Sequence, residues 1–325
     1  MRVLVVTSQW PTSRFPERVP FLVREVNAIR DAGIDIDVFH YSGGFNLRAY
    51  VTAVSRLRQL TKKKQYDLIH GQFGVGGLPA LFTRKHPLVV TYQGSDLNGI
   101  YSTSGQLTIQ GLVLRRVSQL VSIFADEIIL VSRSMARYLP RKKFYVIPGG
   151  IDLEAFRPQP KQYACERLNI PPNRRYILFA GGTNNPIKRY ELAKQTIEIV
   201  KRQHDDVELL VANGVSPSDM PLYLNAASAL LLTSSREGSP NIVKESLACD
   251  CPVASVNVGD IEERIGQISG CAISATDTAE AIAEALQKVL SSSQPFKGRH
   301  AVCSLDLKST ATRIIDVYAS ALQRA

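Results

Sequence analysis

The sequence predicts an α/β protein made of two doubly wound domains in tandem, and three observations predict it. Short apolar runs alternate with longer amphipathic runs along the whole chain, as in parallel sheets that carry helices on both faces. A Pro/Gly-rich stretch at 148–161, PGGIDLEAFRPQPK, interrupts this alternation and is typical of a linker. The length of 325 residues suits two domains of about 150 residues each better than a single core.

The first half of the chain alternates strand and helix patterns. Its candidate strands are short apolar runs, VLVVT (3–7), IDIDVFH (34–40), DLIH (67–70), LVVTY (88–92), EIILV (127–131) and FYVIP (144–148). Helical spacing of apolar residues fills the segments between them, at 21–31, 48–64, 77–85, 107–124 and 132–139. We expect this half to form a domain over residues 1–153.

The second half repeats the alternation after the linker. Its candidate strands are YILFA (176–180), VELLVA (207–212), ALLLTS (229–234) and PVASV (252–256), with helices near 188–203, 217–227, 240–249 and 276–291. We expect a second domain over 154–305, and a helix at 306–325 that crosses back to the first domain. Ligands of such sheets bind beyond the carboxyl ends of the strands, so the expected site is a cleft between two facing sheets.

Composition indicates a soluble globular protein. Hydrophobic residues make up 45% of the chain, and the mean hydropathy is −0.04. No apolar stretch reaches the roughly 18 residues of a membrane span, and the apolar run in MRVLVVTSQWP is too short for a signal peptide, so we expect a cytoplasmic protein. The cysteines are scattered, without metal-ligand spacing, which favours reduced thiols and no metal site.

Positive charge is concentrated in the first half. Residues 1–155 hold 20 Lys and Arg against 11 Asp and Glu, or +9, whereas residues 156–325 hold 19 against 18, or +1. A solubilising surface explains this excess, and so does attraction to an anionic lipid leaflet, a nucleic acid or a phosphorylated substrate. No recognisable nucleic-acid-binding module is present, so we expect no nucleic-acid partner.

The stretch SSREGSPNIVKES, which follows the ALLLTS strand, carries two glutamates eight positions apart, Glu237 and Glu245. Serine is favoured at the N-cap of a helix and proline at its first position, so the pattern predicts a helix with Ser239 as N-cap and Pro240 as first residue. The alternative is two surface glutamates beside an ordinary capped helix.

The start of this helix is a candidate anion site. Three backbone amides are expected to point out of it, those of Asn241, Ile242 and Val243. Orphan N–H groups and the helix dipole stabilise a phosphate there. Gly238 allows a ligand to approach the backbone. Glu245, on the face of Asn241, is placed to accept hydrogen bonds from a ribose, and Glu237 from sugar hydroxyls on the other side.

In the form EGSPNIVKESLACDCPVASVNVGDIEE, this region resembles the retaining GT-B glycosyltransferases of family 4. The resemblance covers nearly the whole chain. MRVLVVTSQWP and FLVREVNAIRDAGIDIDVF look like the first β-α-β unit of that family, VVTYQGSDL like its fourth-strand motif, VIPGGIDLEAFRP like its interdomain hinge, and ILFAGGTNNPIKRYELAKQ like the loop with its diphosphate-binding lysine. The segments are most similar to the teichuronic-acid and exopolysaccharide transferases.

The resemblance implies a GT-B fold, with two Rossmann-like domains facing each other across a cleft, the first binding acceptor and the second the nucleotide sugar. Lys188 matches the lysine that neutralises the leaving diphosphate, Glu245 the glutamate that binds the donor ribose, and Glu237 the one that contacts the transferred sugar. Gly238 and the run Ser239, Pro240, Asn241, Ile242 and Val243 match the helix start under the diphosphate. A lysine and a helix N-terminus can stabilise the departing charge without metal, so no cofactor is implied. Asp35 and Asp37 lie within a strand pattern and are not expected to bind metal.

The chain departs from the family pattern at two positions. Gln93 stands where many members have a histidine that faces the reacting centre, so this side chain can hydrogen-bond to the sugar but cannot act as an acid or base. Gly182 stands where an arginine is common, six residues before Lys188. Backbone amides of Gly181, Gly182 and Thr183 are the expected compensation for that lost cation.

The acceptor side offers fewer indications. The segments 48–64 and 107–124 combine apolar spacing with basic residues, so each fits either a membrane interface or packing against the sheet, and for 107–124 we favour packing. With the basic first half, this gives an expectation of peripheral attachment to the inner face of the plasma membrane. His70 is expected to end a strand at the cleft and to contact substrate.

The sequence therefore predicts a retaining, metal-independent transferase that moves a sugar from a UDP-sugar to a glycan or lipid-linked acceptor in cell-envelope or exopolysaccharide synthesis. Lys188, Glu237 and Gln93 are the expected catalytic residues. A nucleotide-sugar epimerase has the same fold and diphosphate site and is one alternative. A non-catalytic partner subunit is the other, suggested by Gln93 and Gly182.

Overall fold

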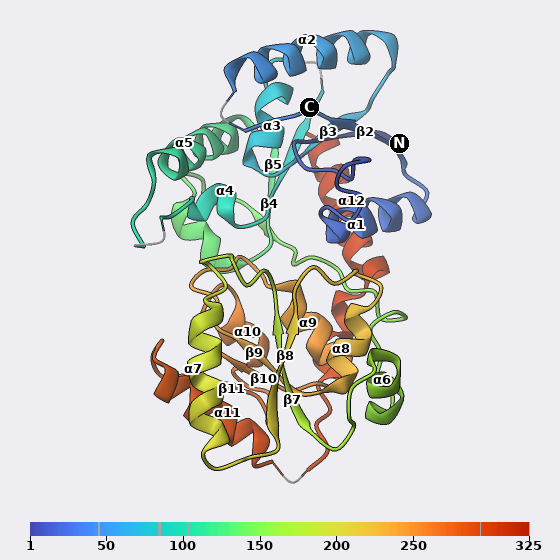
Figure 1. The fold of residues 1–325 in the computed structure, drawn as a ribbon. Coiled ribbons are helices and arrows are strands. Elements are labelled where there is room, and N and C mark those ends of the chain that lie inside the picture. The colour runs from blue at the N-terminus through green and yellow to red at the C-terminus, as the bar shows by residue number, and fades with distance from the viewer. Residues whose placement is uncertain (45, 84–85, 103–104, 293, 325) are drawn as a thin grey trace. The chain divides into compact units, whose positions relative to one another are not determined.

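The computed structural model describes residues 1–44, 46–83, 86–102, 105–292 and 294–324 (Figure 1). The chain divides into two compact units. Unit 1 comprises Met1–Gly150 with Leu307–Ala325, and unit 2 comprises Ile151–Asp306. Each unit is built on one parallel sheet, which confirms the predicted doubly wound α/β class.

Unit 1 carries the larger sheet. Its strands are β1 (Arg2–Thr7), β2 (Asp35–His40), β3 (Leu68–Gln72), β4 (Leu88–Tyr92), β5 (Glu127–Leu130) and β6 (Tyr145–Val146). They lie in the order β2-β1-β3-β4-β5-β6, and every neighbouring pair is parallel. Strands β1, β3 and β4 are buried on both faces, which explains their nearly continuous apolar sequences.

Helices cover both faces of this sheet (Figure 1). They are α1 (Pro20–Asp31), α2 (Leu47–Lys63), α3 (Gly74–Ala80), α4 (Ser95–Asn98), α5 (Ile109–Phe124), the 3-10 helix η1 (Arg133–Tyr138) and α12 (Leu307–Leu322). The helix predicted at 77–85 forms earlier, as α3, and residues 84–85 of that prediction lie outside the described residues. The helix predicted at 306–325 forms as α12, and residue 325 is likewise not described.

Alternating side chains of the strands divide the core of unit 1 into two layers. Leu4 and Val6 of β1 pack in the layer under α2, α3 and α5, whereas Val3 and Val5 pack in the layer under α1 and α12. Tyr318 of α12 is fully buried in the second layer. The last helix of the chain is therefore an integral part of unit 1.

Unit 2 has a smaller sheet of the same kind. Its strands are β7 (Arg175–Ala180), β8 (Val207–Ala212), β9 (Ala227–Leu232), β10 (Val253–Ser255) and β11 (Ala272–Ile273), in the order β11-β10-β9-β7-β8. Its helices are α6 (Lys161–Leu168), α7 (Tyr190–Lys201), α8 (Met220–Ala226), α9 (Asn241–Ala248), α10 (Ile261–Ile265), α11 (Ala279–Leu290) and the 3-10 helix η2 (Arg299–Leu305). The sequence patterns did not predict α4, α6, α10, β11 or η2, all short elements.

The helices of unit 2 also form two layers. Helices α7 and α11 cover one face, and α8, α9 and α10 pack with η2 over the other. All pairs of neighbouring strands are parallel, so the carboxyl ends of β7, β9 and β10 lie at one edge of the sheet. Loops after these strands are where the sequence-predicted donor residues lie. Among the described residues, no helix is both long and apolar enough to cross a membrane.

Candidate active site

Two loops of unit 2 meet at the carboxyl ends of neighbouring strands. The first, 181–189, connects β7 to α7 and is called the lysine loop here; the second, 233–240, connects β9 to α9 and is called the acidic loop. Ser235 N donates to Ile187 O at 2.8 Å, and Thr233 Oγ1 donates to Lys188 O at 2.8 Å. Pairing of β7 with β9 brings the loops together, and these bonds fix their relative position.

Lys188 and Glu237 form an ion pair between the two loops. Lys188 Nζ lies 2.7 Å from Glu237 Oε1, and the two side chains are 24% and 17% exposed. The sequence placed both residues in the site but not this contact. The contact places the ammonium group of Lys188 beside a carboxylate at the carboxyl ends of β7 and β9.

Glycine at position 181 allows Lys188 to lie across the lysine loop. Gly181 has a φ of +147°, which side-chain-bearing residues rarely adopt. A Cβ atom at this position would lie 3.1 Å from Lys188 Cγ and 3.3 Å from its Cε. A side chain at 181 would therefore adopt a strained backbone conformation and would require the Lys188 side chain to shift by a few tenths of an ångström.

The next two residues of the lysine loop have more room. A Cβ atom at Gly182 would meet only Asn185 Cβ at 3.7 Å and Asn213 Oδ1 at 3.9 Å, both ordinary contacts. Thr183 Oγ1 accepts a hydrogen bond from Asn213 Nδ2 at 3.3 Å. Because Asn185 N donates to Gly182 O at 3.0 Å, the loop turns tightly here without needing a side chain at 182.

The predicted cap at the start of α9 is wrong by one residue. Helix α9 begins at Asn241, Pro240 is its N-cap with extended backbone angles, and no side chain caps the end. The Ser239 hydroxyl instead donates to Asp260 Oδ2 at 2.8 Å, which also accepts from Arg264 Nε at 2.8 Å. A charged acceptor binds a hydroxyl more strongly than the helix amides can, so Ser239 turns away from the helix.

The open end of α9 keeps its anion-binding character. Val243 N donates to Pro240 O at 3.1 Å, so this amide is used within the helix turn, contrary to the prediction that it faces a ligand. Asn241 and Ile242 carry the amides of the first two helical positions, which have no partner inside a helix. The site therefore offers two of the three predicted backbone donors.

Two residues with ionisable side chains lie buried on α9, which follows the acidic loop. Glu245 is 8% exposed and Lys244 is fully buried, and both are held by neighbouring groups. The sequence analysis singled out Glu245 but missed Lys244. The helical spacing of Lys244 from buried Leu247 and Ala248 was the available indication that it faces inward.

Other residues that build the site were also missed. Gly259 has a φ of +63°, and a Cβ atom there would lie 2.5 Å from Gly238 O, so the loop after β10 supports the acidic loop through direct backbone contact. Arg189 adopts the left-handed region at the start of α7 and bonds Asp277 at 2.8 Å. Its Nε also donates to Thr233 O. The Gly-Asp pair that follows VASVNV was the sequence signal for the close backbone contact at Gly259.

Gln93 belongs to unit 1, where it follows β4. Its backbone N donates to Asp96 Oδ2 at 3.0 Å, and Asp96 also accepts from the amides of Gly74, Gly94 and Leu97. Burial raises the pKa of Asp96, and these amide hydrogen bonds oppose that shift. The side chain of Gln93 donates from Nε2 to Gln72 Oε1 at 3.1 Å. Both the backbone and the side chain of Gln93 are therefore held in place.

The expectation that His70 contacts substrate is wrong. Strand β3 continues to Gln72, so His70 lies inside the sheet, fully buried under α12. Its Nδ1 is 2.7 Å from Tyr318 Oη, and its Nε2 is 2.8 Å from Thr91 Oγ1. Burial lowers the pKa of His70 to about 3, so it is a neutral, structural residue.

The Asp35-Ile36-Asp37 segment has ordinary electrostatic partners. Asp35 pairs with Arg2 at 2.9 Å, and Asp37 accepts from Tyr66 Oη at 2.7 Å and from Lys64 Nζ at 3.0 Å. The hydrogen bond from Tyr66 is the largest cause that lowers the pKa of Asp37, followed by that from Lys64. Within the described ranges, no three His, Cys, Asp or Glu side chains gather as they would around a metal ion.

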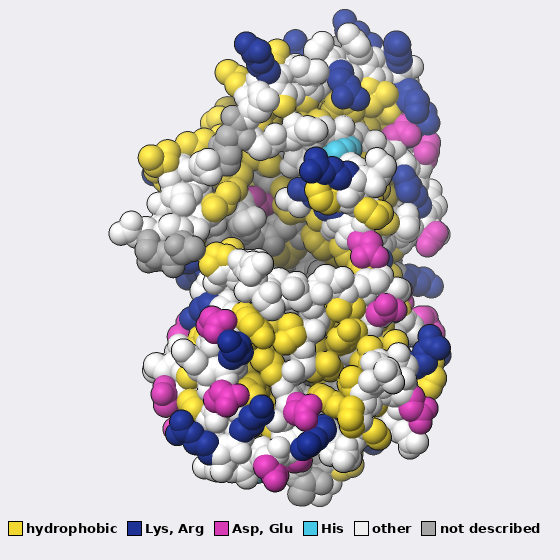
Figure 2. Space-filling view, in the orientation of Figure 1, with side chains coloured by type: hydrophobic (Ala, Val, Ile, Leu, Met, Phe, Trp, Pro, Cys, Tyr) yellow, Lys and Arg dark blue, Asp and Glu magenta, His cyan; other side chains and the backbone are white. Residues whose placement is uncertain are grey.

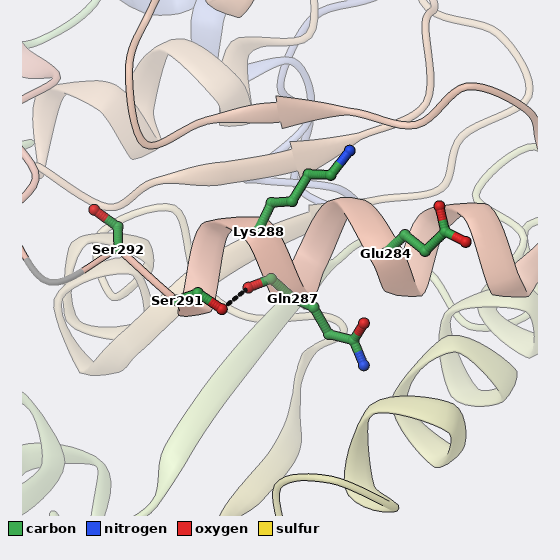
Figure 3. A pocket seen from close by; sticks show the side chains of 5 residues that line it. All are labelled: Glu284, Gln287, Lys288, Ser291 and Ser292. Carbon is green, nitrogen blue, oxygen red and sulfur yellow. Dashed lines mark hydrogen bonds between the residues drawn. The ribbon is translucent and has the colours of Figure 1, made fainter.

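A separate groove of about 590 Å³ lies along the second half of α11. It is lined by Glu284, Gln287, Lys288, Ser291 and Ser292 (Figure 3). A helix that follows a parallel strand runs back along the sheet, so these residues lie toward the amino ends of the strands. This groove is therefore on the opposite side of unit 2 from the lysine and acidic loops.

Two family models match the chain. The model of Glycosyltransferase Family 4 matches residues 1–155, and that of Glycosyl transferases group 1 matches residues 213–292. Among curated relatives, a D-inositol 3-phosphate glycosyltransferase of Thermobispora bispora is 25% identical over 86% of this chain and 76% of its own length. The putative teichuronic acid biosynthesis glycosyltransferase TuaC of Bacillus subtilis is 24% identical over 89% of each chain.

Solved structures share the fold. Sucrose-phosphate synthase of Thermosynechococcus elongatus has a TM-score of 0.79 at 16% identity, covering 100% of this chain and 99% of that one. Anabaena Alr3699/HepE, in complex with UDP-glucose, has a TM-score of 0.72 at 16% identity, covering 98% and 100%. The fold and the two family models together define a glycosyltransferase of the GT-B class. Within that class, residues 1–155 match the family 4 glycosyltransferases.

Proposed function

We propose that this glycosyltransferase moves a sugar from a UDP-sugar to a glycan or lipid-linked acceptor in cell-envelope or exopolysaccharide synthesis, with retention of configuration and without a metal. The observation that carries the proposal is the Lys188–Glu237 pair, set on two bonded loops of which the acidic loop leads into the uncapped start of α9. This arrangement offers a cation and backbone amides to one anionic group, with a carboxylate beside it.

The chemistry follows from the charge that develops when the glycosidic bond to the diphosphate breaks. Lys188 and the amides of Asn241 and Ile242 stabilise the departing diphosphate, because preorganised cations and helix N-termini act where negative charge accumulates. Glu237 serves as counter-ion to Lys188 before the donor binds. When the diphosphate takes over the lysine, Glu237 is released to accept hydrogen bonds from the transferred sugar. Glu245 binds the ribose from α9.

Gln93 is proposed to hydrogen-bond to the transferred sugar. An amide neither gives up nor takes a proton at neutral pH. A retaining reaction with Gln93 at this position therefore uses the leaving phosphate as the base, by front-face displacement. On this proposal, a glutamine in place of the common histidine alters the rate and not the stereochemical course.

The choice of UDP is supported by relatives and not by a contact in this chain. Alr3699/HepE binds UDP and UDP-glucose. A UDP-Gal:α-D-GlcNAc-diphosphoundecaprenol α-1,3-galactosyltransferase of Escherichia coli is 25% identical over 70% of this chain and 57% of its own length. The similarity to TuaC supports a role in envelope polysaccharide synthesis.

Calorimetric titration with UDP, GDP and ADP, followed by the corresponding sugars, tests the donor. We expect UDP to bind in buffer containing EDTA and K188M to bind it at least 10-fold more weakly. Loss of UDP binding on removal of metal would contradict the metal-independent mechanism. Proton NMR of the product distinguishes retention from inversion at the anomeric carbon. Incubation with donor alone distinguishes transfer from epimerisation, and turnover on any acceptor excludes a non-catalytic partner subunit.

Unit 1 is proposed to attach to an anionic membrane surface. Helix α5 packs through small residues such as Gly111, Ser118 and Ser122, while Ile109 is 82% exposed and Phe124 is 56% exposed. Thus α5 does pack within unit 1, as favoured from the sequence, but its large apolar side chains face outward. A lipid surface accommodates apolar and basic side chains together.

Helix α2 extends this surface. A groove of about 620 Å³ runs between α2 and Phe82, lined by exposed Leu47 and Val51 and by Arg58 and Lys62. Figure 2 shows Lys and Arg side chains over α2 and apolar side chains over α5. We expect sedimentation with vesicles containing phosphatidylglycerol and not with phosphatidylcholine alone. Binding that is indifferent to anionic lipid would contradict the attachment proposal without affecting the transferase proposal.

A further inference from the structure

A chain of buried amide and carboxylate groups leads to the side chain of Gln93. Glu25, on α1, is 7% exposed, and Gln72, at the end of β3, is fully buried. Gln72 Nε2 donates to Glu25 Oε1 at 2.6 Å, and Gln93 Nε2 donates to Gln72 Oε1 at 3.1 Å. Helix α1, strand β3 and the loop after β4, all in unit 1, are thus joined by side-chain hydrogen bonds that end at Gln93.

The donor and acceptor order of this chain is determined at its buried end. Gln72 turns its NH₂ group toward Glu25 Oε1, which accepts this hydrogen bond at 2.6 Å. That orientation leaves Gln72 Oε1 facing Gln93. Gln93 must then donate from its own NH₂ group. Its carbonyl oxygen is the remaining polar atom of the amide, and among the described residues none donates to it.

His70 reinforces the orientation of Gln72. Gln72 Nε2 lies 3.4 Å from His70 Nε2. The ring is neutral. In the tautomer with its proton on Nδ1 toward Tyr318, its Nε2 accepts from both Thr91 Oγ1, at 2.8 Å, and Gln72 Nε2. A reversed Gln72 would bring its oxygen against this nitrogen and against Glu25 at once.

We propose that Glu25, acting through Gln72, fixes the Gln93 amide so that a carbonyl oxygen and not an N–H faces the donor sugar. Glu25 is a positioning residue. Gln93 selects sugars that present a hydroxyl group as the hydrogen-bond donor to its carbonyl oxygen. The part that concerns the sugar rests on the proposed function; the order of the chain does not. A side chain that can only accept hydrogen bonds, such as glutamate, cannot replace Gln93 unless the donors and acceptors along Glu25, Gln72 and position 93 all exchange roles.

A double-mutant cycle tests the order of the chain without any ligand. In Q93E, two acceptors face each other at position 93 and Gln72, so we expect the melting temperature to fall by about 3–8 °C. E25Q alone should change it little, because an amide at 25 can still accept from Gln72. In E25Q/Q93E, the amide at 25 can donate instead and Gln72 can reverse. His70 can then carry its proton on Nε2, with Tyr318 Oη donating to Nδ1, so the side-chain hydrogen bonds are satisfied again. We expect at least half of the lost melting temperature to return.

The matched control is E284Q, an exposed position in the middle of α11 in unit 2, combined with Q93E. This pair removes the same charge from the protein and should recover nothing. No loss in Q93E, no recovery in E25Q/Q93E, or equal recovery with E284Q would each overturn the proposed order. Failure of both Q93E and E25Q/Q93E to fold counts as absence of recovery.

Titration with UDP and UDP-glucose separates this proposal from the proposed function. Q93M, which removes the amide, should bind UDP normally and UDP-glucose about 5-fold more weakly, as for one lost hydrogen bond. E25Q/Q93E keeps an acceptor at position 93 and should bind UDP-glucose more tightly than Q93M does. Equal binding of UDP-glucose by these two variants would refute the sugar-facing oxygen. Absence of UDP binding in every variant and in the wild type would contradict the proposed function, and the melting cycle would still decide the order of the chain.

Discussion

Replacing Gly182 by arginine should tighten nucleoside-diphosphate binding. The lysine loop has room for the side chain, because a Cβ atom at 182 would approach no described atom closer than 3.7 Å. The φ of Gly182 lies outside the left-handed region, so the backbone needs no adjustment. A guanidinium six residues before Lys188 would add charge-assisted hydrogen bonds to the phosphates that Lys188 is proposed to bind.

The size of the gain follows from the exposure of the loop. Hydrogen bonds between charged groups contribute about 1.5–3 kcal/mol when well formed, and solvent around a half-buried loop reduces this to about 1–2 kcal/mol. The dissociation constant of UDP should therefore fall about 5–30-fold. Titration calorimetry of wild type and G182R, in low and high salt, measures it. The gain should shrink as the salt concentration rises.

G182M provides the matched control, because methionine adds a long side chain without charge. It should leave UDP affinity within about 2-fold of wild type, as expected for a surface substitution without new polar contacts. Equal affinity of G182R and wild type, or an equal gain in G182M, would refute the placement of the diphosphate beside the lysine loop. G182R combined with K188M should recover part of the affinity lost in K188M.

Four other substitutions test separate parts of the proposed mechanism and of the fold. K188M should weaken UDP about 10–100-fold, whereas E237Q should keep or improve UDP affinity and weaken the UDP-sugar, as titration of both ligands shows. The pKa of His70 is about 3 in the folded protein and near 6.5 in the unfolded chain, so the unfolded protein binds an extra proton below pH 6.5. The free energy of unfolding should therefore fall by about 2 kcal/mol from pH 7 to pH 5, as urea titrations measure. This fall should disappear in H70Q. G259A, whose Cβ would lie 2.5 Å from Gly238 O at a φ of +63°, should lower the melting temperature and weaken UDP together; a variant with normal UDP affinity would contradict support of the acidic loop by this glycine.

The sequence predicted the doubly wound class because its signal is repeated in every strand. Runs such as VLVVT and LVVTY are buried on both faces, and the structure has them at β1 and β4 within one residue of the predicted bounds. Strand β11 has two residues and helix α10 has five. Segments this short carry too little periodicity to be distinguished from a loop, so neither element was predicted.

The candidate site was predicted less well wherever long-range contacts decide. Local preference favoured Ser239 as a cap, but Asp260, twenty-one residues later, takes its hydroxyl. His70 lies only two residues before the end of β3, and α12, from the far end of the chain, covers it. Neither partner is visible in the local sequence. Tertiary contacts overrode sound local rules in both cases.

Some features had no sequence signal at all. Val19 adopts the left-handed region with a φ of +47°, where β-branched residues are rare, and the chain gives no warning of it. The bond between Gln72 and Glu25 joins residues 47 positions apart. The Lys188–Glu237 pair spans 49 positions, and it changes the interpretation of both residues from separate ligand contacts to a coupled pair.

A crystal structure of the protein with UDP tests the central claim most directly. The account predicts the diphosphate against the amides of Asn241 and Ile242, with Lys188 Nζ moved from Glu237 to a phosphate oxygen. A UDP molecule bound elsewhere, with the Lys188–Glu237 pair still closed at 2.7 Å, would contradict it.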